Sequence, residues 1–461
     1  MIKVLLLVVS LGLCSCAQPT KFERPTLPVP GQWDDALAPR QTNATKTHWR
    51  VFFSDPQLQR LIAIALKNNR DLRIAAGRVE EARAQFGITR ADLGPTFNLM
   101  GTGNVSTYPA NLSGTGTSLT SRRFDLSVSA VSYEIDFWGR VANLTDAARM
   151  TYLSSEESRR SVYLSLVADV AQSYLTVLQM SELIDLERST VLLRDESLKI
   201  IQKGQELGGA NDFEYQQARG MLESAQSVLV GYEHQKNVAR NKLSFLLGNA
   251  TFDLQAGVTL DDVGLDFGLT PGLPADVLLQ RPDVMAAEQR LMAAHANIGA
   301  ARAAFLPKVV LTASLGAASQ GLLSLFTGGA WSFLPSITMP LFDGGRTAAG
   351  LDLAQARKVI AVAEYERSIQ VAFREVADLL SARASLAQQV KSSNASLQVN
   401  ARRLEIAQGR FQAGVGGYLD VLDAQREAIA ALQMAAQLRM AQLDSNVQLY
   451  KALGGGQEEV G

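Results

Sequence analysis

Histidine and cysteine are scarce in this sequence, and their scarcity excludes several kinds of chemistry. Among 461 residues there are 3 histidines and 2 cysteines. Spacings that ligate zinc, such as HxxxH, do not occur. A GxxxxGK[ST] phosphate loop and a GxSxG nucleophile elbow are also missing. We therefore predict that the protein is not an enzyme, has no metal site, and needs no cofactor apart from a covalent lipid.

An excess of charge of one sign is missing as well. The chain has 44 Lys and Arg against 45 Asp and Glu, which gives a formal net charge of -1. A surface that binds nucleic acid usually carries a basic excess, so we expect no nucleic-acid partner.

Long apolar runs are rare, and the run at the N-terminus is short. It extends from Val4 to Leu13, which is too short to span a bilayer and is typical of a signal peptide. The letters LCSC resemble a bacterial lipobox, with small Ser15 directly before Cys16. We predict that residues 1–15 are removed and that Cys16 becomes the lipidated first residue. An ordinary signal peptide is the alternative.

This processing has two consequences. Cys14 is lost, so the mature chain has no partner for an internal disulfide. Ala17 follows Cys16, a pattern that resembles sorting to the outer membrane. Residues 16–55 are rich in proline, which lacks a backbone donor and fixes φ, so we predict an extended tether there.

The most informative feature is an internal duplication. Residues 71–95 match residues 283–307, and further matches continue downstream. The paired residues are Asp71 with Asp283, Gly87 with Gly299, Ala91 with Ala303 and Pro95 with Pro307, then Gly208 with Gly414, Glu214 with Asp420 and Ala218 with Ala424. We predict a first repeat at 56–250, a connector at 251–274, a second repeat at 275–453 and a flexible C-terminus at 454–461.

Both repeats show the same order of elements. Helices are expected at 56–92 and 275–304, where proline is absent from the interior. Two strands follow in each repeat, because apolar and polar residues alternate there with period two. The apolar members are Phe97, Leu99, Val105, Phe124, Leu126, Val128 and Ala130, then Val309, Leu311, Ala313, Leu315, Trp331, Phe333, Ile337, Met339 and Leu341.

Two very long helices come next, at about 140–204 and 346–410. Roughly 65 residues at 1.5 Å each make a rod of about 100 Å. Apolar residues recur every seven positions, which indicates supercoiled packing against other helices. They are Tyr163, Val170, Val177, Ile184, Val191 and Leu198, then Val362, Ile369, Val376, Val390, Leu397 and Leu404, with Arg383 interrupting the second series. Glycine-rich breaks follow, and return helices are expected at 212–247 and 418–453.

Four strands of this kind cannot form a closed barrel within one chain. An open edge in lipid leaves unpaired N–H and C=O groups, and small membrane barrels have about eight strands. The chain must therefore oligomerise, and its periodicity alone does not choose between a dimer and a trimer.

Three stretches resemble a known family. YEIDFWGRV (133–141), RPDVMAAEQRLMAAHANIGAARAAFLP (281–307) and RFQAGVGGYLDVLDAQ (410–425) are similar to TolC-like outer-membrane factors, in the lipoprotein branch that serves resistance-nodulation-division pumps. The resemblance implies a mixed α/β membrane protein. Three protomers would build a twelve-stranded barrel in the outer membrane, continuous with a twelve-helix periplasmic tunnel. The partners would be a periplasmic adaptor, an inner-membrane pump and outer-membrane lipid.

The implied function is passive export of small substrates, either drugs, toxic compounds or metal ions. The stretch 410–425 resembles the tip at the closed end of the tunnel. Asp420 and Asp423 would form acidic rings there, with Glu214 as a weaker candidate in the first tip. Stabilisation of a helix N-terminus is the alternative role for these carboxylates. The glycines expected at hinges or adaptor contacts are Gly208, Gly209, Gly414, Gly416 and Gly417.

This sequence departs from the enteric drug-efflux channel at two of the tip positions. Gly416 stands where that channel has an arginine, and Phe411 replaces a tyrosine. Three other readings stay open: a channel for type I protein secretion, a coiled-coil lipoprotein spacer, and a lipid-anchored enzyme.

Overall fold

The computed structural model describes residues 22–30, 47–114, 116–249, 251–254, 257–265 and 278–455. The expected signal peptide, Cys16, parts of the tether and connector, and the last six residues lie outside these ranges. The chain divides into two compact units. One contains Met1–Thr26, Gly77–Glu156 and Ala286–Arg367, and the other contains Leu27–Ala76, Glu157–Met285 and Ser368–Gly461. Each unit therefore draws on both sequence repeats.

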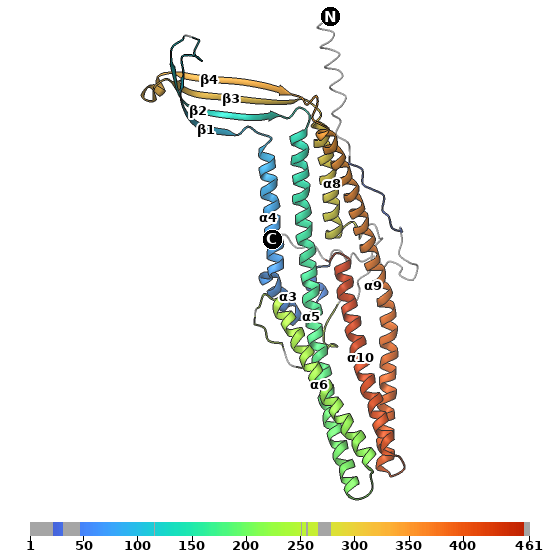
Figure 1. Cartoon of the computed structure of the whole chain (residues 1–461). Helices are drawn as coiled ribbons and strands as arrows, with labels where there is room; N and C mark the ends of the chain where they lie inside the picture. Colours follow the sequence, from blue (N-terminus) through green and yellow to red (C-terminus); the bar gives the residue numbers. More distant parts are fainter. Residues whose placement is uncertain are drawn as a thin grey trace. The chain divides into compact units, whose positions relative to one another are not determined.

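From α4 and from α8 onward, the described elements occur in the same order in both repeats, except that the second repeat also contains the short helix η3 (Figure 1). The elements are α2 (Trp49–Phe52), α3 (Pro56–Asn68), α4 (Arg70–Ala91), β1 (Phe97–Tyr108), β2 (Leu119–Ile135), α5 (Arg140–Glu206) and α6 (Asp212–Leu246), then α8 (Pro282–Ala303), β3 (Lys308–Ser319), η3 (Leu322–Thr327), β4 (Gly329–Thr338), α9 (Arg346–Gln412) and α10 (Tyr418–Ala452).

Three details differ from the sequence predictions. The helix expected at 275–304 begins only at Pro282. The helix expected at 56–92 is broken at Asn69, which is buried and extended, with φ -62° and ψ 134°. Its side-chain amide donates to the Leu246 carbonyl, and its Oδ1 accepts from the Leu72 amide, both at 3.0 Å. Asn69 thus ends α3 and caps α4. The fourth strand ends at Thr338, so Met339 and Leu341 lie beyond it.

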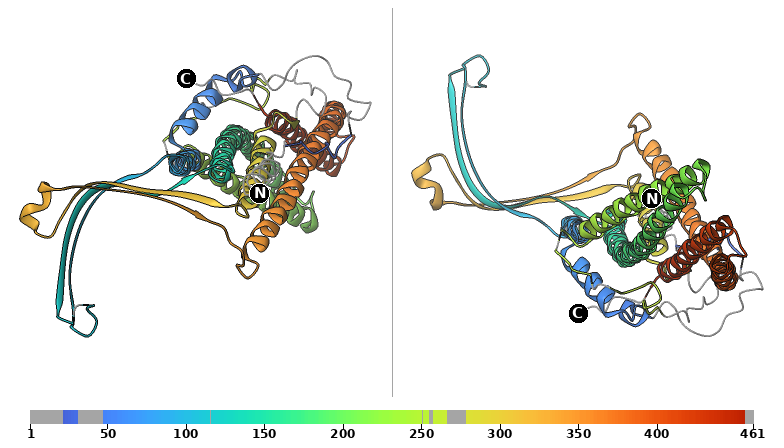
Figure 2. Two further views of the ribbon diagram at one scale, coloured as in Figure 1. Left: turned by 90° about the horizontal axis from the view of Figure 1, so that it is seen from above. Right: turned by 90° about the horizontal axis from the view of Figure 1, so that it is seen from below.

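The four strands form one antiparallel sheet in the order β1-β2-β3-β4. Pairing between β1 and β2 continues out to Leu119, whereas pairing between β2 and β3 begins at Phe124. The two hairpins are therefore separate at their turn ends, and Figure 2 shows them diverging there. A bulge follows Ala130, where Ser132 has a positive φ of 56°.

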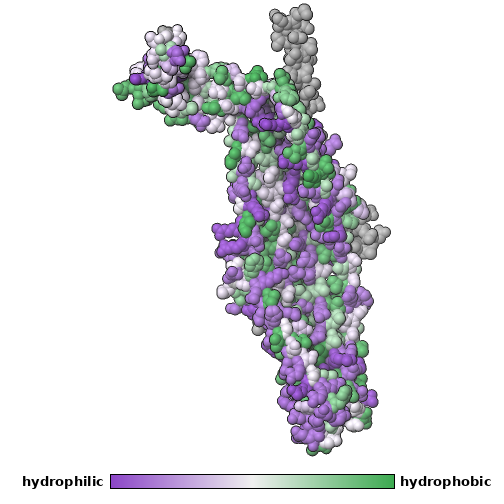
Figure 3. Space-filling model, viewed as in Figure 1, coloured by the Kyte–Doolittle hydropathy of each residue, from purple (hydrophilic) through white to green (hydrophobic). Residues whose placement is uncertain are grey.

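The register assigns opposite characters to the two faces of the sheet. Residues directly opposite each other on neighbouring strands share a face. One such row crosses all four strands and is exposed and apolar, and it consists of Leu99, Val128, Leu315 and Trp331. The next row lies on the other face and is polar, and it consists of Asn98, Ser129, Ser314 and Ser332. Figure 3 shows hydrophobic side chains along the strands.

The second unit has a core built around aromatic residues and α5. The Tyr450 ring stacks on Phe52 with centroids 4.5 Å apart, and both side chains are fully buried. The Tyr174 hydroxyl donates to Asp55 at 2.9 Å, and Asp55 also caps α3 by accepting from the Gln57 amide at 2.7 Å. An apolar stretch of α5 is long enough to cross a membrane, but 67% of that stretch is buried, as expected of a core helix.

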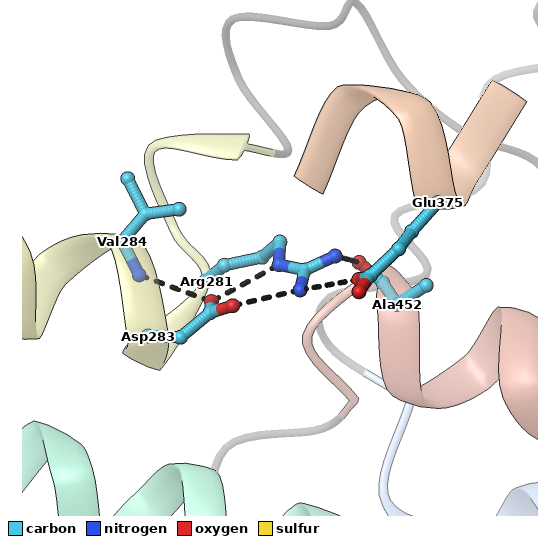
Figure 4. Close-up of polar contacts among 5 residues, drawn as sticks. All are labelled: Arg281, Asp283, Val284, Glu375 and Ala452. Atoms are coloured by element: carbon cyan, nitrogen blue, oxygen red, sulfur yellow. Dashed lines mark hydrogen bonds and ion pairs between the residues drawn. The ribbon is translucent and has the colours of Figure 1, made fainter. Parts of the chain in front are cut away.

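A buried arginine joins three segments of the second unit (Figure 4). The Arg281 guanidinium donates to Asp283 at 2.8 and 3.0 Å, to Glu375 of α9 at 2.8 Å, and to the Ala452 carbonyl at 2.9 Å. Asp283 also accepts from the Val284 amide at 3.0 Å. The start of α8, the middle of α9 and the end of α10 are therefore held by one side chain. A cavity of about 420 Å³ lies beside it.

Arg281→Ala is expected to lower the melting temperature of the purified protein clearly. The substitution leaves the buried Ala452 carbonyl without its donor, and an unsatisfied buried acceptor costs about 1–3 kcal/mol. Asp283 and Glu375 are about 40% exposed, so water can solvate their carboxylates. Arg281→Lys should lose less. Circular dichroism at 222 nm during heating measures the change. The matched control is Arg402→Ala, which removes an exposed pair with Glu405. Equal shifts for Arg281→Ala and Arg402→Ala would contradict this account.

Candidate functional site

The candidate site is the pair of tips where each long helix turns into its return helix, at 207–211 and 413–417. Both turns are built in the same way. Gly208 and Gly414 have positive φ values of 76° and 72°. In each tip the next amide donates to the carbonyl five residues earlier, at 2.8 and 3.0 Å. This is the Schellman arrangement that ends a helix, and it explains glycine at both positions.

The other three tip glycines differ in what they require. A Cβ on Gly416 would lie 3.0 Å from the Arg410 Cβ, so the chain approaches closely there. Gly417 is the N-cap of α10 and provides no capping side chain. Gly209 has neither a positive φ nor a close neighbour. A hinge or adaptor contact at these five glycines stays a prediction, and geometry alone accounts for three of them.

The first tip contains Glu214, the weaker acidic candidate. Its amide donates to the Asn211 Oδ1 at 2.9 Å, and its carboxylate accepts from the Asn211 amide at 3.0 Å. This reciprocal pair is a capping box, which stabilises the start of α6. The geometry therefore gives Glu214 a local structural task that needs no pore.

The second tip separates the two aspartates that the sequence grouped together. Asp420 is exposed in the first turn of α10, and the structure shows no ion pair to it among the described residues. Asp423 pairs with Arg403 of α9 and, at 2.9 Å, with Arg426 of α10. Arg426 also reaches Glu427 at 3.1 Å. These four side chains balance in charge, so Asp420 is the uncompensated acid of the tip.

A polar seam lies on α5 before the helix reaches the first tip, and the sequence analysis missed it. Its members are Glu187, Thr190, Arg194 and Ser197, and all four are buried. Arg194 donates to Gln425 of α10 at 3.0 Å, and burial lowers the pKa of its guanidinium. The signal was present in the sequence, because the spacings of three, four and three residues are those of a buried helix face.

A second hydrogen bond of the seam also joins α5 to α10. Gln433 of α10 donates to the Glu187 carboxylate at 3.4 Å. A cavity of about 460 Å³ lies beside these residues, lined by α5, α6 and α10. Buried polar contacts of this kind set the register between helices more than they add stability.

Among residues 22–30, 47–114, 116–249, 251–254, 257–265 and 278–455, no group of three or more His, Cys, Asp or Glu is placed to hold a metal ion.

Comparison with known proteins places these features in a family context. The sequence model described as "Outer membrane efflux protein" matches residues 61–249 and 273–455. The toluene efflux pump outer membrane protein TtgF of Pseudomonas putida is 42% identical over 469 residues, covering 98% of this chain and 97% of that protein. The cation efflux system protein CusC of Escherichia coli is 40% identical over 462 residues, with coverage of 98% and 99%.

The chain is also similar to a solved structure of an outer membrane channel. The crystal structure of the open state of the MtrE outer membrane channel from Neisseria gonorrhoeae superposes with a TM-score of 0.88 at 35% identity. The match covers 96% of this chain and 98% of that one.

Glu187→Gln is expected to raise the melting temperature at pH 8 and to leave it nearly unchanged at pH 4.5. Burial raises the pKa of Glu187, so the native state favours the protonated acid. Its contribution is full below the ordinary carboxyl value of 4.5 and is lost as pH rises through the raised pKa. Glutamine mimics the protonated form at every pH. Melting curves at several pH values test this, and a variant less stable than wild type at pH 8 would contradict it.

Proposed function

The chain belongs to the outer membrane efflux protein family, and we propose that it works as the outer-membrane exit channel of an efflux pump. It conducts passively and catalyses no reaction. Three copies pair their sheets edge to edge into a twelve-stranded barrel, and their helices form a tunnel in the periplasm. The observation that supports this most directly is the sheet, with an apolar row on one face and a polar row on the other.

The channel acts with two further proteins and with lipid. A periplasmic adaptor meets the helical tips, and an inner-membrane pump of the resistance-nodulation-division type supplies the energy. The adaptor shifts the tips from closed to open by binding the open state better. Cys16 carries the lipid that anchors the chain to the outer membrane, and the protein needs no cofactor beyond it.

The cargo is a small molecule or ion whose identity is set by the pump. Relatives of nearly equal similarity carry names that differ in this respect, because TtgF is named for toluene and CusC for cations. The relatives with these names are parts of efflux pumps, which favours efflux over type I protein secretion. The matched channel structure favours a pore over a spacer.

The tip controls which ions pass. Three copies of Asp420 form an acidic ring that is not neutralised within each protomer. Asp423 contributes less to the field, because Arg403 and Arg426 compensate its charge. A carboxylate ring favours cations. Opening requires Gln425, Gln433 and Asp423 to give up their present polar partners, and water can replace those partners at small cost.

Single-channel recording in planar bilayers tests this account. Asp420→Asn should lower the ratio of cation to anion permeability about twofold or more, because it removes three uncompensated charges from the constriction. Asp423→Asn should change selectivity less. It should instead lengthen open times, because it breaks the contact with Arg403.

The control is Asp185→Asn, an exposed change on α5 outside the tips. It should match wild type in both selectivity and open time. If Asp420→Asn matches wild type as well, the acidic ring is wrong and the channel remains. If properly folded trimers give no current under any condition, the conducting function itself is wrong.

A further inference from the structure

A short N-terminal segment lies against α8 in the unit that carries the sheet. Arg24 Nε donates to the Glu288 Oε1 at 2.6 Å. The Phe22 ring meets His295 edge-on, with centroids 5.8 Å apart and planes at 73°. Glu288 and His295 are seven residues apart on α8, so they lie on the same face of the helix two turns apart. The segment therefore has one polar and one aromatic contact with one helix face.

The ion pair is asymmetric in its burial. The Glu288 side chain is 8% exposed, whereas that of Arg24 is 50% exposed. Tyr365 of α9 is fully buried, and burial together with the Glu288 charge raises the pKa of its phenol. Among the described residues, Arg24 is the cation that pairs with Glu288. If the segment leaves, Glu288 loses the cation that pairs with it, whereas the docked segment both pairs with this carboxylate and leaves little of it in water.

This arrangement is more specific than a chain merely resting on a surface. A tether that only needed length would gain nothing from a buried acid on the helix beneath it. We propose that Glu288 and His295 of α8 form a docking site for the chain's own N-terminal segment. The Arg24–Glu288 pair acts as the pin that fixes the membrane anchor close to the sheet-bearing unit.

The anchor in question is the lipid on Cys16, so the inference rests on the lipidation proposed above. From Cys16 to Phe22 there are six residues, which span at most about 20 Å. Without the pin, the next hydrogen bond along the described chain is the one that the Thr47 carbonyl accepts from Tyr450. From Cys16 to Thr47 the chain could reach roughly 100 Å. The Arg24–Glu288 pair therefore shortens the greatest possible reach from Cys16 to the first fixed residue about fivefold.

Limited trypsin digestion of the purified full-length protein in detergent tests the pin. Trypsin can cut after Lys21, but it does not cut after Arg24 because Pro25 follows. A protease needs several residues on both sides of the bond in its active site, so Phe22 and Arg24 must first undock. Arg24→Ala and Glu288→Gln should each speed cutting after Lys21 at least tenfold. Arg24→Lys, which keeps the charge, should stay near the wild-type rate.

The matched control is Arg83→Ala, which removes an exposed ion pair with Glu80 in the same unit. It should leave the cutting rate unchanged. Melting curves recorded alongside identify any variant that has lost its fold, and the conservative Glu288→Gln keeps the test decisive if Arg24→Ala misfolds. Wild-type cutting rates in both Arg24→Ala and Glu288→Gln would overturn the pin.

The same digest separates this inference from the lipidation on which it rests. Cutting after Lys21 releases the peptide CAQPTK, residues 16–21, and mass spectrometry shows whether acyl chains are attached to Cys16. An acylated peptide released faster from the variants supports both ideas. A peptide without lipid overturns the lipid anchor, and with it the shortened reach from Cys16. The cutting rates would still report on docking of the segment.

Discussion

The unpaired edges of a four-stranded sheet are the constraint from which most of this protein follows. Strands β1 and β4 each have one side without a partner strand among the described residues. In lipid every such N–H and C=O must be satisfied, so the edges require neighbouring protomers. The row from Leu99 to Trp331 is exposed and apolar, whereas the row from Asn98 to Ser332 on the other face is polar. One register thus provides both a lipid face and a water face, and neither works in a monomer.

Gene duplication meets this constraint economically. Each repeat contributes one hairpin, and β2 pairs with β3 across the repeats over Phe124 to Ile135. The same duplication reproduces the tip, because Gly208 and Gly414 adopt the same turn with equivalent hydrogen bonds. The copies then diverge in their chemistry. Glu214 closes a capping box, whereas its counterpart Asp420 has no capping partner and remains exposed.

The periodicity of the sequence predicted most of the helices and strands. It could not predict contacts between residues that are far apart in the sequence. The long helices and return helices begin and end within about two residues of their predicted positions, because proline and glycine mark their ends. The break at Asn69 was missed, because its cause is the Leu246 carbonyl, 177 residues away. The pairing of Asp423 with Arg403 was missed for the same reason, since no spacing rule connects α9 to α10 across a turn.

The polar contacts of the helices differ in how readily water can replace them. Arg281 donates four hydrogen bonds from a position that is 7% exposed, and one of them goes to the buried Ala452 carbonyl, which water does not easily reach. The network at Asp423 is exposed and neutral in sum, so its members can exchange partners with solvent. The seam at Arg194 and Gln425 is intermediate: buried, yet built on a hydrogen bond to a neutral amide. This gradient would favour the opening at the tips that is proposed above, because a uniformly apolar seam would resist separation along its whole length.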